Sequence, residues 1–179
     1  MAGLIKFLLR NFTLTFLVIG LSCSVVVLFL KQKPLNKHQI VEALFAYFLL
    51  FSIGMSFLYN FIMHVFFSDM AAAFIGWKNS PFQYEVGFAS LGFAIVGMIA
   101  FKQGLGFRAA CVIGPSFFLW GAAGGHVYQM ITMHNFAPGN AGVIFWTDLI
   151  LPIIAFVLLY QQYKLERVPF SRNAANRAA

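Results

Sequence analysis

Four ionisable side chains interrupt otherwise apolar stretches of the sequence and are the first candidates for chemistry. They are His64, Glu85, His126 and Asp148. An ionisable group within hydrocarbon is costly unless it is paired, hydrated or bound to a cation, so each is a candidate functional residue. Neutral imidazole nitrogens and carboxylate oxygens donate electron pairs, and together they suit Zn, Fe or Mn. We therefore predict a divalent metal site, with redox chemistry as one use of it, formed by these four residues and supported by Asn60 and Gln129.

Other functions use the same four residues. A haem with His64 and His126 as axial ligands is the less favoured cofactor. Without a metal, the residues form a pocket that binds a proton or a small solute, or they belong to a transporter. They can also pair as salt bridges, for example Asp148 with a protonated His64 or His126, in a structural subunit of a membrane complex. These alternatives stay open because the sequence has no P-loop, Rossmann fingerprint, nucleophile elbow or metalloprotease motif.

Polar residues recur at every fourth position of the second apolar segment, namely Ser52, Ser56, Asn60, His64 and Ser68. This spacing places them on one face of a helix whose other faces carry Phe, Leu and Ile. Such a stripe turns towards the interior of a bundle, where it either forms hydrogen bonds between helices or lines a pocket. In the fourth segment Gly121 and Gly125 precede His126 at the GxxxG spacing, which is a common helix-packing motif.

The start of the third apolar segment determines the depth of Glu85. Ser80 is expected to cap the helix, with Pro81 at its first position and Gln83 completing a capping box. Glu85 then lies in the first turn, where the helix dipole also favours an acid that has no function. The residues below Glu85 on its own face are mostly small and are expected to admit a neighbouring helix: Ala89, Gly92 and Val96.

Asp148 lies deeper in its apolar segment than a helix cap would. Pro152, four residues later, cannot donate a hydrogen bond to the carbonyl of Asp148. Such a gap in helical hydrogen bonding is tolerated where the backbone faces protein or water, which favours a polar site at Asp148. Glu42, in contrast, is expected at the other end of the second segment as a solvated acid near the loop lysines.

The composition identifies the surroundings of these residues. The chain has 179 residues, of which 61% are hydrophobic and 9% are charged, against about 25% charged in soluble domains. A soluble fold of this size cannot bury so much apolar surface, so the lipid bilayer is the expected partner, with a homo-oligomer or a membrane complex as further possibilities. The net charge of +7 comes from short basic clusters between apolar runs. That layout is typical of membrane-flanking segments and not of a nucleic-acid-binding groove.

Five segments are long and apolar enough for helices that cross a bilayer core of about 30 Å. We predict an all-α bundle of five transmembrane helices within a single domain, residues 1–163, followed by a cytoplasmic polar tail, residues 164–179. The stretch "LVIGLSC" in the first segment is interpreted as part of a retained helix, with a cleaved signal as the alternative. The predicted spans are residues 12–30, 40–67, 82–101, 107–133 and 143–160.

The loops between these spans divide the basic residues unequally. One side of the membrane would carry Lys6, Arg10 and Lys78. The other would carry nine, namely Lys31, Lys33, Lys37, Lys102, Arg108, Lys164, Arg167, Arg172 and Arg177. Cytoplasmic loops are the ones enriched in Lys and Arg, so the N-terminus is predicted outside and the C-terminus inside. The four ionisable residues then lie in the outer half of the bilayer and form an outward-facing site.

Two long polar stretches, "GWKNSPFQYEVGFA" and "GAAGGHVYQM…NFAPGNAG", are unusual for membrane helices. They resemble the signature stretches of a family of small bacterial integral membrane proteins that is defined only as a domain of unknown function. The resemblance covers roughly residues 40–160. It implies a helical membrane fold and a multi-pass location in the bacterial inner membrane, and it implies no specific activity.

Overall fold

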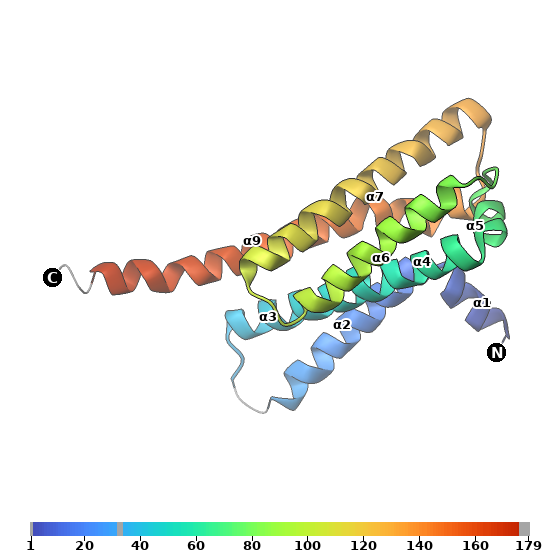
Figure 1. Cartoon of the computed structure of the whole chain (residues 1–179). Coiled ribbons are helices and arrows are strands. Elements are labelled where there is room, and N and C mark those ends of the chain that lie inside the picture. Colours follow the sequence, from blue (N-terminus) through green and yellow to red (C-terminus); the bar gives the residue numbers. More distant parts are fainter. Residues whose placement is uncertain (1, 32–33, 176–179) are drawn as a thin grey trace.

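The computed structural model describes residues 2–31 and 34–175, and over these residues the chain is helical apart from short connections (Figure 1). Lys33 and Arg177, which contribute to the predicted orientation, lie outside the described residues. The elements in chain order are α1 (Ala2–Arg10), α2 (Phe12–Leu30), α3 (Lys37–Phe48), η1 (Leu49–Met55), α4 (Ser56–Phe66), α5 (Ser68–Ile75), α6 (Phe82–Ala100), α7 (Leu105–Met133), α8 (Pro138–Ala141) and α9 (Val143–Ala175).

Five stretches of helix are long and apolar enough to cross a membrane, which confirms the number of spans predicted from the sequence. They are Phe12–Leu30, Lys37–Phe66, Phe82–Ala100, Leu105–Met133 and Pro138–Arg167. The second stretch joins α3, η1 and α4 without a break. The last one differs most from its prediction, because α9 continues beyond Tyr160 and runs into the polar tail as far as Ala175.

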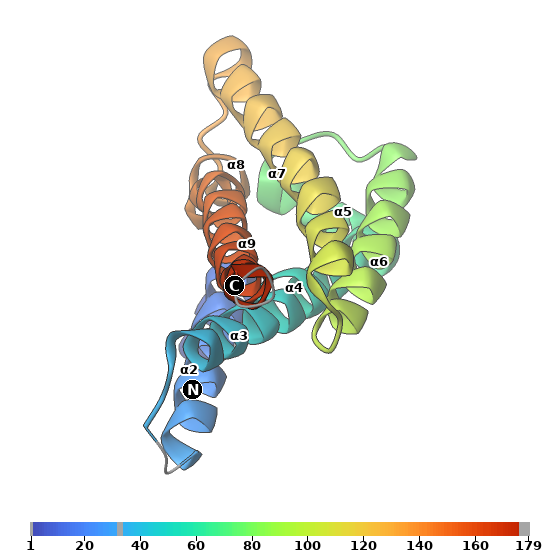
Figure 2. The ribbon, with the colours of Figure 1, turned by 90° about the vertical axis from the view of Figure 1, so that its left-hand side faces the viewer.

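The second stretch is the central helix of the bundle. In its most apolar window 56% of the residues are buried, against 17% to 28% in the other four stretches. The other helices pack around it. The central helix contacts α6 through α4, and α7 packs beside α9 (Figure 2). The hydrophobic core therefore follows this helix from α3 into α4, through Phe45, Leu49, Ile53 and Phe57.

The packed face of α6 is not the face that contains Glu85. The buried residues of α6 include Gly87, Ser90, Ala94 and Gly97, whereas Glu85, Ala89 and Gly92 are exposed. A Cβ atom built on Gly97 would lie 2.6 Å from the backbone nitrogen of Gly54, so the two backbones touch. A small-residue face therefore exists as expected, but it is rotated away from Glu85.

The beginning of α6 also differs from the expected capping box. Pro81 occupies the N-cap position and makes no side-chain cap hydrogen bond, and Phe82 is the first helical residue. Gln83 turns into the protein instead and contacts His64 on α4. A partner on another helix thus replaces the local partner that the spacing predicted.

Segment η1 is a π-helix in the middle of the central helix. A π-helical turn contains one residue more than an α-helical turn would, so it shifts the faces on either side of it. Ser52, inside η1, is buried and its hydroxyl has no hydrogen-bond partner among the described residues. The polar stripe of the sequence is therefore split, and its hydrogen bonds to another helix begin at Asn60, in α4.

We name each end of the bundle after a buried polar residue near it, and call the two ends the His126 end and the Arg108 end. The end of α7, α5 and α1 lie at the His126 end, on the right-hand side of Figure 1, and α8 follows α7 there. At the Arg108 end lie the α6–α7 connection and the start of α3. The described basic residues at the Arg108 end are Lys31, Lys37, Lys102, Arg108, Lys164, Arg167 and Arg172, against two acids, Glu42 and Glu166. At the His126 end three basic residues are balanced by three acids. The excess of positive charge therefore lies at the Arg108 end.

Arg108 is a buried structural residue and not a loop cation, and Glu42 is correspondingly not a solvated acid. The guanidinium is 1% exposed, and it binds both carboxylate oxygens of Glu42 at 2.6 and 2.7 Å. Its other donors reach the side chain of Gln162 and the backbone carbonyls of Ala100 and Phe101. All five N–H groups are therefore used, and they connect α3, α7, α9 and the end of α6.

Candidate functional site

His126 and Asp148 form a buried pair between α7 and α9. The Nε2 atom of His126 lies 3.6 Å from Oδ2 of Asp148, and the two side chains are 6% and 5% exposed. His126 is seven residues from the end of α7 at Met133, or about 10 Å at the helical rise. Two ionisable groups are thus held together within apolar spans, near one end of the bundle.

Asn140 fixes the other side of the His126 ring. This residue is completely buried in α8, the short helix between α7 and α9. Its side-chain nitrogen donates to the backbone carbonyls of His126 at 3.2 Å and Asn135 at 2.9 Å. Its side-chain oxygen lies 2.8 Å from Nδ1 of His126 and accepts a hydrogen bond from Nε1 of Trp77 at 3.0 Å.

These contacts determine the protonation of Nδ1. Because the amide nitrogen of Asn140 donates to two carbonyls, the atom facing His126 is the amide oxygen, which can only accept. Nδ1 of His126 must therefore carry a hydrogen. Nε2, on the side of Asp148, then carries either a lone pair or a second hydrogen.

The loop that contains Asn140 is attached to the rest of the bundle through backbone contacts. Asn135 donates to the carbonyls of Ile75 and Gly76 and accepts from the backbone N–H of Ala137. Gly76 has φ of 77°, a conformation that favours glycine, and a Cβ there would lie 2.7 Å from the Asn135 side chain. The α5–α6 connection therefore holds the α7–α9 connection, and with it Asn140, in place.

His64 and Asn60 belong to a separate polar contact between α4 and α6. His64 is buried, and its Nδ1 forms a hydrogen bond with Oε1 of Gln83. One turn earlier, the side chain of Asn60 donates to the hydroxyl of Ser90 at 2.9 Å. The polar stripe of the second span thus forms hydrogen bonds between helices, which was one of its two predicted uses.

Within the described residues, no side-chain hydrogen bond or ion pair connects the remaining predicted residues, Glu85 and Gln129, to the pair. Glu85 is exposed on α6, in the first helical turn. Gln129 is half-buried on α7, and its backbone carbonyl accepts from the N–H of Asn135 where the helix ends. The structure therefore brings together His126 and Asp148, two of the four predicted metal ligands. Within residues 2–31 and 34–175 no group of three or more His, Cys, Asp or Glu side chains is placed to hold a metal ion.

The sequence analysis missed three residues of this end of the bundle, namely Trp77, Gln83 as a partner of His64, and Asn140. Each of them lies within one of the two polar stretches that set the resemblance, and Asn140 is in a loop that contains no Lys or Arg. A fully buried asparagine in such a loop has to satisfy its amide within the protein. The concentration of Asn, Gly and Pro in "NFAPGNAG" was the available signal, and it was interpreted only as part of the family resemblance.

The fold and the site together define a helical protein with five candidate membrane spans and a buried His–Asp pair near one end. Over residues 10–168 the chain matches the family of unknown function DUF6790 and belongs to it. The matched region contains every residue of the pair and of its surroundings. Comparison with curated proteins and with solved structures found no match.

Proposed function

We propose that the protein is a membrane protein that binds a proton between His126 and Asp148. The observation that supports this is the 3.6 Å separation of Nε2 and Oδ2 together with the hydrogen that Asn140 imposes on Nδ1. Without a cation between them, an imidazole lone pair and a carboxylate would face each other in an apolar setting and repel. A shared proton removes this repulsion, either as an imidazolium–carboxylate pair or as a neutral acid beside a neutral imidazole.

Release of that proton leaves a net negative charge among apolar helices, so the equilibrium depends on how well water or a solute reaches the pair. Buried Asp and His residues in membrane proteins commonly belong to proton relays for this reason. We therefore assign the site to a module that binds a proton, alone or together with a small solute. The position of His126, about 10 Å from the end of its helix, gives the shortest access from the His126 end.

A divalent metal is the second candidate, and one distance favours it. Two ligands of a tetrahedral zinc ion, each about 2.0–2.2 Å from the metal, lie roughly 3.3–3.6 Å apart, which matches the His126–Asp148 separation. Metal-binding histidines also donate their second N–H to a fixed partner, as Nδ1 does to Asn140. The described residues supply two ligands, so water or amide oxygens would have to complete the coordination. A haem with His64 and His126 as axial ligands gains no support, because Nε2 of His126, the ring nitrogen that Asn140 leaves free, faces the carboxylate of Asp148 at 3.6 Å.

Trp77 provides a direct test of proton binding. Its ring centroid is 5.6 Å from that of His126, and its N–H shares the Asn140 oxygen with that residue. In a chain with Trp120→Phe and Trp146→Phe, we expect the fluorescence of Trp77 to follow pH through one transition. His126→Gln and Asp148→Asn should each abolish that transition, because either change removes one of the two groups that hold the proton.

His64→Gln is the matched control, since it removes a second buried histidine that has a separate partner, and the transition should persist in it. Fluorescence that is independent of pH, or a transition that survives both His126→Gln and Asp148→Asn, would rule out proton binding. Metal analysis of protein purified without chelator separates the second candidate. Stoichiometric Zn, Fe or Mn in the wild type that is lost in His126→Gln would show that the site binds a metal instead of a proton.

We further propose that the His126 end faces outside and that the protein resides in the bacterial inner membrane. Arg108 no longer counts as a loop charge, because it is paired with Glu42, yet eight basic residues still oppose three. Reporter fusions after Lys78 and at Ala179 should therefore report an outside and an inside location, respectively. The opposite pattern would place the His126–Asp148 site near the cytoplasmic face and would leave proton binding itself unaffected.

A further inference from the structure

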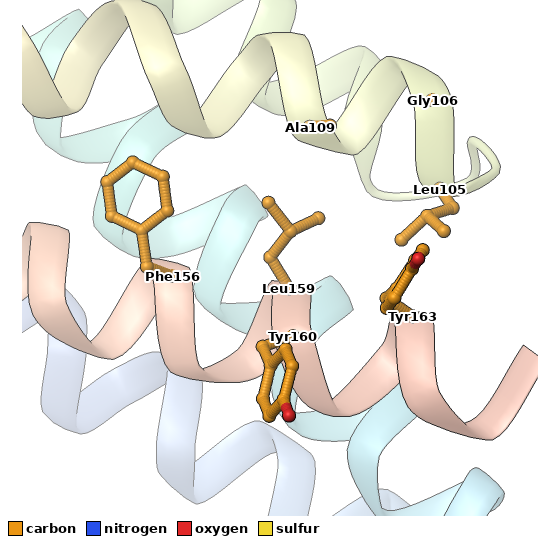
Figure 3. A pocket seen from close by; sticks show the side chains of 7 residues that line it. All are labelled: Leu105, Gly106, Ala109, Phe156, Leu159, Tyr160 and Tyr163. Carbon is orange, nitrogen blue, oxygen red and sulfur yellow. The ribbon is translucent and has the colours of Figure 1, made fainter.

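An open groove lies between α7 and α9 at the Arg108 end, far along both helices from the His126–Asp148 pair (Figure 3). Its volume is about 410 Å³, within the range of about 300–1,000 Å³ that ligand sites occupy. Gly106 and Ala109 of α7 form one wall, and Leu159 and Tyr163 of α9 point towards it in Figure 3, whereas the ring of Tyr160, which also lines the groove, extends from the other side of α9. A Cβ built on Gly106 would meet no atom within 4 Å, so the missing side chain of this residue leaves the space open.

The groove is apolar and lies within the part of α9 that is apolar enough to span a membrane. Apart from the hydroxyl groups of the two tyrosines, the side chains that line it are hydrocarbon, as Figure 3 shows. An occupant must therefore be a hydrocarbon chain along most of its length. A lipid acyl chain has this chemistry, and the bilayer supplies it along the whole side of the bundle.

Two cations stand at the tyrosine end of the groove. The Lys164 ammonium lies 5.2 Å from the ring centre of Tyr160, and the Arg167 guanidinium lies 4.6 Å from that of Tyr163. Both basic side chains are exposed. Each is held over an aromatic ring that lines the groove, so a positive charge is fixed where an acyl chain would join its headgroup.

The acids of this end cancel that charge only in part. Glu42 is bound by Arg108, whereas Glu166 accepts a hydrogen bond from the neutral amide of Gln162 and keeps its charge, so Lys164 and Arg167 together retain one positive charge in excess. Arg108 itself is unavailable to a ligand, since all five of its N–H groups have protein partners. An anion that enters from the membrane surface therefore finds Lys164 and Arg167 as its partners.

We propose that this groove binds one acyl chain of an anionic phospholipid and that Lys164 and Arg167 bind its phosphate group. Tyrosines and basic residues at the membrane–water interface, and basic sites between helices, are the features that recognise anionic headgroups. The site is independent of the proton-binding proposal, because it shares no residue with the His126–Asp148 pair.

The test uses the full chain in nanodiscs of phosphatidylcholine that contain a minor fraction of phosphatidylglycerol. After transfer to mild detergent, native mass spectrometry counts the lipids that remain bound. We expect one phosphatidylglycerol per chain, retained in preference to phosphatidylcholine. Lys164→Gln and Arg167→Gln should each weaken that preference about fivefold, and the double variant should lose most of it.

Gly106→Leu tests the acyl-chain part of the site. The new side chain would enter the groove without touching the protein around it, so the lipid should be lost while the thermal unfolding temperature stays near that of the wild type. Gly92→Leu is the matched control, because Gly92 is an exposed helical glycine of α6 whose Cβ would also meet no atom within 4 Å. This control should retain the lipid.

Three outcomes would overturn the proposal. The first is equal retention of phosphatidylglycerol and phosphatidylcholine by the wild type. The second is retention by Gly106→Leu that equals retention by Gly92→Leu. The third is a dimer, seen in the same spectra, that Gly106→Leu disrupts, which would make a second copy of the chain the occupant of the groove.

Discussion

Replacing Arg108 by alanine is expected to lower the free energy of unfolding by about 3–5 kcal/mol, the range for breaking a buried ion pair by removing one partner. The guanidinium is 1% exposed and uses every donor, so its removal takes a hydrogen bond from the Ala100 and Phe101 carbonyls and from the Gln162 side-chain oxygen, and it takes both hydrogen bonds from the Glu42 carboxylate. It also leaves a cavity against Phe45, whose ring centre lies 5.4 Å from the guanidinium carbon. Denaturant unfolding in detergent, followed by circular dichroism, measures the loss.

Two further variants define the cause of that loss. Arg108→Lys keeps the charge but has no planar fork for the two oxygens of Glu42, so it should recover only part of the stability. Lys102→Ala removes an exposed basic residue from the same end of the bundle and should change the stability little. If Arg108→Ala unfolds like Lys102→Ala, the network around Arg108 does not hold the bundle together.

Asn140→Ala is expected to destabilise the protein by about 3 kcal/mol, because one substitution removes the hydrogen bonds that a fully buried side chain makes to four groups. These groups are the N–H of Trp77, Nδ1–H of His126 and the carbonyls of His126 and Asn135. The pH transition of Trp77 fluorescence should also change, since Nδ1 of His126 would no longer be fixed as a donor. Denaturant unfolding and the fluorescence titration measure the two effects separately.

Asn79→Ala is a suitable control for Asn140→Ala. Asn79 lies in the α5–α6 connection at the same end, and it binds Ser68 and Asp69 in an exposed cluster. Its loss should alter the stability only slightly. Equal stability of the two alanine variants would mean that Asn140 is not the residue that secures this end of the bundle.

The sequence predicted the number of spans because length and apolar composition determine whether a helix can cross a bilayer. The same information could not reveal η1, since a π-helix leaves the hydropathy of a segment unchanged. Nor could it orient α6: the spacing of Glu85, Ala89 and Gly92 describes a valid small face, and so does that of Gly87, Ser90 and Gly97. Only the close approach of Gly97 to Gly54 decides between these two faces.

The site was predictable to the extent that a single residue is informative by itself. His126 and Asp148 were identified because an ionisable residue in an apolar segment requires a partner, and the structure pairs them. The partner of His64 could not be deduced, because Gln83 had an equally plausible local use in a capping box. Glu42 and Arg108 are 66 residues apart, and each stands among loop lysines where a solvated charge is the ordinary case.

The two buried polar clusters differ in how far apart their residues lie along the chain, and therefore in when protein synthesis completes them. His126, Asn140 and Asp148 belong to one helical hairpin, α7–α8–α9, so their charges can be matched while that hairpin enters the bilayer. The Arg108 cluster needs Glu42 from the second span, Arg108 from the fourth and Gln162 from the fifth. A chain that ends before Gln162 therefore lacks the partner of one Arg108 N–H, so this cluster is complete only when the fifth span has been made.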